Sequence, residues 1–363
     1  MAAWRLGAFR FVSVRDGVAV TAPQIPCDRS LGTMGTEVSW QTQPVLLAVT
    51  TDGGRHWVTR GRPLPGTGSG TGTGSEASMQ VAAVDGAAVW VVGPSGAMFV
   101  TRDDGATWTR APLQVPVLAA ASAGGWLWEL SCQAVSGQAV PGLACPPVVE
   151  RMRLPGGAWT RSDVPVPGGV RDASLTVVSG QDAVLAVSGV HPALLSTGDG
   201  GARWTVHPTP TDPGFWCSAD FTGTFAASGP DDWWLLCPGG AAAGSSSKAL
   251  MRSADAGRTW TVVASVTLSG PRRAGSLPYQ NGAEIAASPA GRLWIVTPNT
   301  LNVSTDGGAR WTQAAFNPGG YLAFGRFDVL PGPVAWLLAT GAGLWQTTDG
   351  TTWRAIAGGG PGQ

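Results

Sequence analysis

The sequence predicts an all-β fold built from seven repeated units, each with four antiparallel strands. Two observations lead to this prediction. An octapeptide of the form [ST]-x-D-x-G-x-x-W recurs along the chain, and its tryptophans lie 51, 51, 45, 56, 51 and 42 residues apart. Spacings of this size leave room for four short strands in each unit. The 53 glycines and 28 prolines supply many turns, and no helical period persists along the chain.

The octapeptide is predicted to form a tight turn between two strands. Ser, Thr and Asp side chains accept hydrogen bonds from backbone N–H groups a few residues later, and glycine adopts conformations that other residues reach only at a cost. The tryptophan then opens the next strand. Each copy offers a single carboxylate, which disfavours a metal site. The aspartates of the five complete copies and of one shortened copy are Asp52, Asp103, Asp199, Asp255, Asp306 and Asp349. A seventh copy, residues 153–159, keeps the glycine and tryptophan but lacks the aspartate.

The octapeptide resembles the Asp-box, or bacterial neuraminidase repeat, of the sialidase-like superfamily. This repeat is found in sialidases, sortilin-type receptors, xyloglucan-degrading hydrolases and the photosystem II assembly factor family. The resemblance implies a seven-bladed β-propeller, closest in blade number to the photosystem II assembly factor-like propellers. In these families the box joins the third and fourth strands of a blade and lies away from the ligand. The six aspartates are therefore expected to be structural.

The repeats are expected to form a single domain over residues 1–363, because units of this period stack into one continuous body. The tail, residues 358–363, is expected to be disordered. The predicted blades cover residues 9–60, 79–110, 117–163, 174–207, 225–266, 283–316 and 326–356.

The composition argues against several classes of function. The 23 basic and 23 acidic residues balance, whereas a nucleic-acid-binding protein needs a basic surface. No apolar run reaches the ~18 residues of a membrane span. The first residues, from Met1, do not form a signal peptide, so a cytoplasmic location and a trimmed leader both stay open.

The five cysteines favour an oxidising compartment, and so an extracytoplasmic or secreted protein. Cys132 and Cys145 are expected at the ends of adjacent strands of one blade, and Cys217 and Cys237 flank a strand pair of another. Both pairs are placed to form disulfides, which leaves Cys27 unpaired. No C-x-x-C occurs and only three histidines are present, so we expect no metal and no cofactor.

Long loops are expected on one face only. The first-to-second and third-to-fourth turns of each blade are short, and the remaining connections lie at the opposite ends of the strands. The long loops are residues 23–44, 63–75, 133–147, 210–222, 239–247 and 267–281. Long loops on a rigid scaffold concentrate function, and arginine and aromatic residues are enriched at binding hot spots. The candidate ligand-binding residues in or near these loops are Arg29, Trp40, Trp216, Arg272, Arg273, Tyr279 and Tyr321.

The sequence contains no recognisable catalytic motif. There is no nucleophile elbow with plausible histidine and acid partners, and no phosphate-binding loop. The stretch from Phe9 to Val12 only faintly resembles the motif that carries the first arginine of sialidases, because it lacks the proline. We therefore predict a non-catalytic, monomeric propeller that binds a protein or glycan on the long-loop face. The alternative is a sialidase-like glycan hydrolase, which needs two placed carboxylates, or a tyrosine nucleophile with a glutamate, at the channel mouth.

Overall fold

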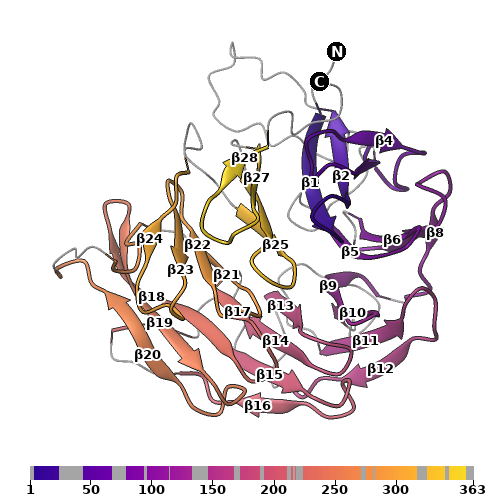
Figure 1. Cartoon of the computed structure of the whole chain (residues 1–363). Helices are drawn as coiled ribbons and strands as arrows, with labels where there is room; N and C mark the ends of the chain where they lie inside the picture. The colour runs from indigo at the N-terminus through magenta and orange to yellow at the C-terminus, as the bar shows by residue number, and fades with distance from the viewer. Residues whose placement is uncertain are drawn as a thin grey trace. The chain divides into compact units, whose positions relative to one another are not determined.

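The protein is a seven-bladed β-propeller, as the sequence predicted, and each blade is a sheet of four antiparallel strands (Figure 1). Neighbouring strands in a sheet follow one another in the chain. The computed structural model describes residues 4–23, 44–67, 79–93, 96–113, 115–132, 146–166, 172–188, 192–210, 214–215, 217, 224–270, 275–280, 283–316, 325–339 and 343–356. These residues contain no helix.

The chain forms two compact units. The first contains residues 1–131, 152–159 and 356–363, and the second contains residues 132–151 and 160–355. A single domain over residues 1–363 stays a prediction. The tail expected to be disordered lies outside the described residues.

Blades 1 and 2 belong to the first unit, and blade 3 has strands in both. Blade 1 comprises β1 (Trp4–Phe11), β2 (Gly17–Pro23), β3 (Leu46–Thr50) and β4 (Val58–Arg60). Blade 2 comprises β5 (Gln80–Asp85), β6 (Ala88–Val92), β7 (Met98–Thr101) and β8 (Thr109–Arg110). Blade 3 comprises β9 (Val117–Ala123), β10 (Trp126–Cys132), β11 (Pro147–Arg153) and β12 (Thr160–Asp163).

Blades 4 to 7 follow in the second unit, coloured from pink to yellow in Figure 1. Blade 4 comprises β13 (Asp172–Val177), β14 (Ala183–Ser188), β15 (Ala193–Thr197) and β16 (Thr205–His207). Blade 5 comprises β17 (Phe225–Ala227), β18 (Trp233–Ala242), β19 (Ser245–Ser253) and β20 (Thr261–Val266). Blade 6 comprises β21 (Glu284–Ala287), β22 (Leu293–Val296), β23 (Leu301–Ser304) and β24 (Thr312–Gln313). Blade 7 comprises β25 (Gly325–Val329), β26 (Ala335–Ala339), β27 (Gly343–Thr347) and β28 (Arg354–Ala355).

The tryptophan of each octapeptide precedes the fourth strand instead of opening it, which corrects the sequence-based prediction. In blade 6, for example, Trp311 is followed by β24 beginning at Thr312. The Trp311 ring N–H donates to the carbonyl of Gly308, 2.9 Å away, so this residue still belongs to the turn. The turn therefore extends one residue further than the octapeptide pattern suggested.

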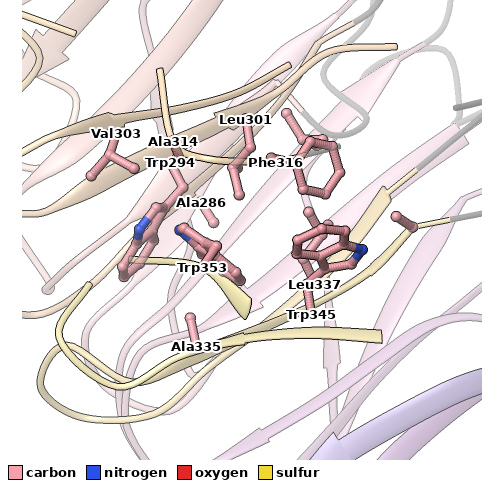
Figure 2. Packing of buried hydrophobic residues seen from close by; sticks show 12 residues of the cluster. Ala286, Trp294, Leu301, Val303, Ala314, Phe316, Ala335, Leu337, Trp345 and Trp353 are labelled. Carbon is pink, nitrogen blue, oxygen red and sulfur yellow. The ribbon is translucent and has the colours of Figure 1, made fainter. Parts of the chain in front are cut away.

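Hydrophobic layers lie between blades 1 and 2, 2 and 3, 4 and 5, 5 and 6, and 6 and 7. In the layer between blades 6 and 7, the rings of Trp294 and Trp353 meet edge to face, with centroids 6.2 Å apart (Figure 2). Phe316 and Trp345 lie in the same layer, with centroids 4.6 Å apart. The second strands of blades 2, 5 and 6 contribute Trp90, Trp234 and Trp294 to these layers, and Trp294 is fully buried. Aromatic rings thus contribute to the packing between these neighbouring blades.

One predicted long loop is a β-hairpin. The segment Gly239–Ser247 was expected to be a loop, but β18 continues to Ala242 and β19 begins at Ser245. The two residues between the strands, Ala243 and Gly244, have φ values of 49° and 77°. Two successive left-handed residues form the tight turn that matches the twist of paired strands. The paired strands of this hairpin are therefore longer than those of blade 6, where β22 ends at Val296 and β23 begins at Leu301.

Candidate functional site

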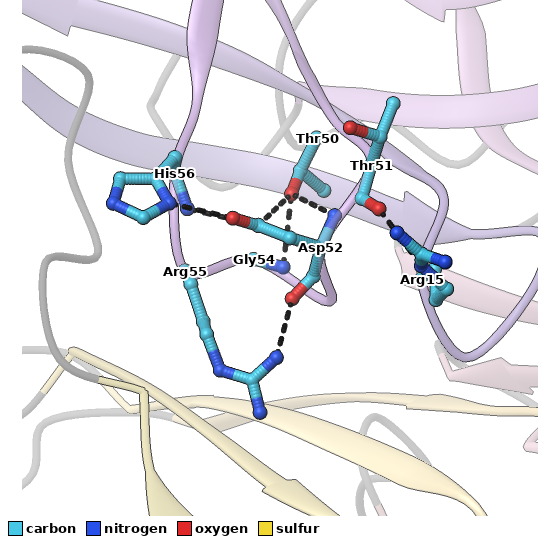
Figure 3. Close-up of polar contacts among 7 residues, drawn as sticks. All are labelled: Arg15, Thr50, Thr51, Asp52, Gly54, Arg55 and His56. Atoms are coloured by element: carbon cyan, nitrogen blue, oxygen red, sulfur yellow. Dashed lines mark hydrogen bonds and ion pairs between the residues drawn. The ribbon is translucent and has the colours of Figure 1, made fainter.

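The octapeptide turns close through their own side chains, as Figure 3 shows for the turn of blade 1. The Thr50 hydroxyl donates to Asp52 Oδ1 at 2.9 Å and accepts the N–H of Gly54 at 2.9 Å. Asp52 Oδ1 in turn accepts the N–H of His56 at 2.9 Å, and Asp52 Oδ2 lies 2.6 Å from the His56 ring. The same hydroxyl, carboxylate and backbone bonds recur around Asp103, Asp199, Asp255, Asp306 and Asp349.

These hydrogen bonds favour the charged form of the carboxylates. Partial burial raises the pKa of Asp52, but the hydrogen bonds from His56 and Thr50 outweigh it and bring the pKa to about 2. The hydroxyl and backbone N–H of Thr259, with Ser253, lower the pKa of Asp255 to about 2. A carboxyl group with a lowered pKa stabilises the fold above its ordinary pKa of 3.8, and this stability is lost as the pH falls toward 2.

In the blade 2 turn, the buried Thr101 hydroxyl should contribute more to stability than the exposed Thr107 hydroxyl. Thr101 is 1% exposed and accepts the N–H of Gly105 at 2.7 Å, whereas Thr107 is exposed and donates to Asp103. We expect Thr101→Val to lower the free energy of unfolding by about 1–3 kcal/mol, because a buried donor loses its acceptor. The matched variant Thr107→Val should change it by less than about 0.5 kcal/mol. Urea unfolding of both variants tests this, and equal losses would contradict the structural role of Thr101.

In blades 1, 4 and 5, the turn between the first and second strands is hydrogen-bonded to the octapeptide turn. The Gly53 N–H donates to the carbonyl of Arg15 at 2.8 Å. Likewise, the Gly200 N–H donates to the carbonyl of Gln181 at 2.9 Å, and the Ala256 N–H donates to that of Asp231 at 3.0 Å. These pairs belong to blades 1, 4 and 5. The two kinds of short turn therefore share one side of these blades, and the remaining connections lie on the other.

Arginines of one blade reach the octapeptide turn of the next blade. Arg151 of blade 3 donates to the carbonyl of Gly180, 2.7 Å away, and its guanidinium occupies the space where Gly200 would carry a side chain. In the same way a Cβ on Gly350 of blade 7 would lie 2.6 Å from the Arg292 Cδ of blade 6. These glycines are needed for the neighbouring arginine as well as for their own turns.

An open depression lies between the octapeptide turn of blade 2 and the equivalent turn of blade 3, and sequence reasoning missed it. It has a volume of about 440 Å³ and is lined by Arg102, Arg153, Leu154, Pro155, Gly156 and Gly157. Arg102 reaches across from blade 2 and donates to the carbonyl of Pro155 at 3.1 Å. In the sequence, the one feature that marks the place of this depression is the missing aspartate of the blade 3 repeat.

On the long-loop side, the hairpin of blade 5 is held along both edges. Cys217 and Cys237 form the disulfide expected from the sequence, and Phe215 pairs with Gly239 on the same edge. On the other edge Ser245 pairs with Gln280. The Ser246 N–H donates to the carbonyl of Tyr279 at 2.6 Å. The exposed end of the hairpin, residues 240–244, thus projects from a firmly fixed base.

Lys248, the only lysine of the chain, lies at the base of this hairpin and is only 3% exposed. Its ammonium group donates to the Ser246 hydroxyl at 2.8 Å and to the carbonyl of Gln280. No carboxylate forms an ion pair with it among the described residues. Burial lowers the pKa of Lys248 from 10.5 to about 8. Nothing in the sequence indicates this burial, because lysines are rarely buried.

The buried lysine should make the protein more stable as the pH rises above 8. Between about pH 8 and its ordinary pKa of 10.5, Lys248 holds a proton in the unfolded chain but not in the folded one. Stability rises with pH wherever the unfolded state binds more protons. We expect a gain of up to about 2 kcal/mol between about pH 8 and about pH 9.5. Lys248→Met should lose this gain in denaturant titrations, and the same pH slope in both proteins would contradict the assignment.

Most of the candidate ligand-binding residues lie outside the described part of the chain. These are Arg29, Trp40, Trp216, Arg272, Arg273 and Tyr321, and the same holds for Cys27 and Cys145. Tyr279 is described: it is half-buried and packs against the apolar layer between blades 5 and 6. Cys132 ends β10, and its pairing with Cys145 stays a prediction.

Two further observations concern the described residues as a whole. They contain no group of three or more His, Cys, Asp or Glu side chains placed to hold a metal ion. No helix in this part of the chain has the length and apolarity to cross a membrane.

Comparison with solved structures supports the fold. The chain resembles an ancestral GH74 enzyme with a TM-score of 0.61 and 10% identity, over 98% of this chain but 46% of the enzyme. It therefore spans about half of that protein. It also resembles YCF48 bound to D1 peptide, with a TM-score of 0.58 and 16% identity, over 93% of this chain and 91% of YCF48. YCF48 from Cyanidioschyzon merolae gives a TM-score of 0.51 at 16% identity, over 94% and 97% of the two chains.

These likenesses define the class of protein, a seven-bladed β-propeller, and at such low identity they extend to the fold alone. No protein-family model matches the chain, and no curated protein matches it in sequence.

Proposed function

We propose that this protein is a non-catalytic binding or scaffold propeller that recognises a protein or glycan on its long-loop side. The observation that carries the proposal is the blade 5 hairpin, which a disulfide and two strand bridges hold rigid. A rigid projecting element lowers the ordering cost of binding. Tyr279 lies on the segment that pairs with the hairpin. The similarity to YCF48, solved with a bound peptide, is consistent with a protein partner.

The proposal includes the nature of the repeats and the setting of the protein. The octapeptide turns are Asp-box turns of the sialidase-like superfamily, with their six aspartates in structural roles. The protein acts as a monomer outside the cytoplasm, where the Cys217–Cys237 disulfide persists. Its ligand-binding residues are those proposed from the sequence on the long-loop side.

The test compares the two sides of the blades. A glycan array and a displayed peptide library, probed with the wild-type protein, supply the ligand. Replacing Arg272 and Arg273 together with alanine should weaken binding at least tenfold, which is the order expected for a pair of interfacial arginines. The control Arg310→Ala removes an exposed arginine from an octapeptide turn and should leave affinity unchanged. Full-strength binding by the double variant, with loss on altering Arg15 or Asp85 in the short turns, would place the functional surface on the opposite side.

The alternative function is glycan hydrolysis, which the resemblance to GH74 enzymes favours. Hydrolysis of a glycosidic bond needs two carboxyl groups about 5–10 Å apart. Incubation with xyloglucan oligosaccharides and sialyllactose distinguishes the two functions. Release of reducing sugar or sialic acid by the wild-type protein would overturn the non-catalytic proposal.

A further inference from the structure

The turn between the third and fourth strands of blade 3 departs from the other six. Leu154 stands five residues before Trp159, in the position that Asp103 holds before Trp108. In the other six turns the glycine three residues before the tryptophan has φ between 78° and 94°, whereas the equivalent Gly156 does not adopt the left-handed conformation. This turn has no carboxylate to accept its backbone donors, so it is held in a different way.

The blade 3 turn is held by backbone hydrogen bonds within its own blade and by an arginine from blade 2. The Leu154 N–H donates to the carbonyl of Gly125 at 2.9 Å, and the Gly157 N–H donates to that of Arg153 at 2.7 Å. Arg102 donates to the carbonyl of Pro155. The Arg102 guanidinium also lies 5.8 Å from the centroid of the Trp90 ring, within range of a cation–π contact. Arg102 is therefore positioned before any ligand arrives, while its side chain stays exposed.

Arg102 and Arg153 together give the depression a positive charge that the protein does not neutralise. Asp103, next to Arg102, accepts bonds from Thr101 and Thr107 inside its own turn. Within the described residues, neither Arg102 nor Arg153 forms an ion pair with a carboxylate. The remaining lining residues, from Leu154 to Gly157, carry no charge. The site thus has two arginines, Arg102 and Arg153, among lining residues that are otherwise uncharged and partly apolar.

We propose that this depression binds an aspartate or glutamate side chain on an exposed segment of a protein partner. The partner's carboxylate takes the place of the one that the blade 3 repeat lacks. A guanidinium can bind a carboxylate through two parallel N–H donors, which is the strongest common pairing of this kind. A Cβ on Gly156 would lie 3.3 Å from the Arg102 guanidinium. Since glycine has no Cβ, this side of the guanidinium stays uncovered. The volume of about 440 Å³ is sufficient for one or two side chains of an extended peptide.

The site lies on the octapeptide side of the blades and goes beyond the function proposed for the long-loop side. The two are separable by mutation. Replacing Arg272 and Arg273 should leave binding of an acidic peptide unchanged. A failure of either proposal therefore leaves the other standing.

The first experiment uses fluorescence polarisation with a labelled peptide of glycine and serine around two adjacent aspartates. An otherwise identical peptide with asparagines is the control ligand, and an oligomer of glucuronate tests a glycan source of the carboxylate. We expect the wild-type protein to bind the aspartate peptide, and Arg153→Ala to weaken binding by about tenfold or more, as for loss of a hydrogen bond to a charged group. Arg153→Ala removes no described side-chain contact, and Arg310→Ala serves as the matched arginine control.

A second pair of variants tests the role of the missing carboxylate. Leu154→Asp places a carboxylate beside the two arginines and should abolish peptide binding by competing for them. Leu154→Asn loses the same apolar packing without adding charge, and it should retain binding within about threefold. Circular dichroism confirms that both variants fold.

Several results would overturn the proposal. These are no binding of the aspartate peptide at millimolar concentration, equal binding of the asparagine peptide, unchanged affinity in Arg153→Ala, or equal loss in the two Leu154 variants. Binding of the glucuronate oligomer without the peptide would also overturn it, in favour of a glycan ligand.

Discussion

Replacing Trp294 with alanine is expected to lower the free energy of unfolding by about 3–5 kcal/mol. Trp294 is fully buried in β22, and its ring meets Trp353 edge to face between blades 6 and 7. Its ring N–H also donates to the carbonyl of Gly350 at 2.9 Å. The substitution therefore opens a cavity between two blades and leaves a buried acceptor without its donor. Chemical unfolding followed by tryptophan fluorescence and circular dichroism measures the loss.

Two companion variants separate these contributions. Trp294→Phe keeps most of the ring but loses the N–H donor, and it should cost about 1–3 kcal/mol. Val262→Ala removes a side chain that is 46% exposed on β20 and should change stability by less than about 0.5 kcal/mol. If Trp294→Ala were no more damaging than Val262→Ala, packing between blades 6 and 7 would not limit stability.

Removing the Cys217–Cys237 disulfide is expected to cost about 3 kcal/mol. The bond joins residues 20 apart in sequence, and cross-linking a loop of that size reduces the entropy of the unfolded chain by about this amount. Both cysteines are buried in the layer between blades 4 and 5, so their replacement by alanine keeps the site apolar. The measurement is the urea midpoint of the double alanine variant against wild type.

Reduction of the wild-type protein provides an independent control. A thiol reductant should shift the wild-type midpoint toward that of the double variant and leave the variant itself unchanged. Peptide mapping without reductant then shows whether Cys132 and Cys145 form the second predicted bond. A wild-type midpoint that ignored the reductant would mean that the Cys217–Cys237 bond does not stabilise the fold.

The fold was predictable because its information is local and repeated. Each octapeptide carries the hydroxyl, carboxylate and glycine that close one turn, so the turns and the strand pairs around them follow from short stretches of sequence. The hairpin at residues 239–247 was not predictable in this way. Glycine, alanine and serine have low strand propensity, and here pairing with Phe215 and Gln280 overrides that preference.

The candidate sites depend on contacts between distant parts of the chain. Arg102 and Pro155 are 53 residues apart, and neither turn alone indicates that they share a depression. Lys248 has an ordinary sequence context, and only the packing of Gln280 across the hairpin shows that its ammonium is enclosed. A pattern within one repeat predicts the turn that it forms, but not what the next blade places against it.

The enclosure of Lys248 protects the only lysine of the chain from reagents that react with amines. Reagents that acylate amines find a single side chain in the whole sequence, and that side chain is 3% exposed. Apart from the terminal amine, labelling can then proceed only in molecules whose segment 275–280 has left the hairpin. The rate of acylation at Lys248 accordingly reports the opening of blade 5 without any engineered probe.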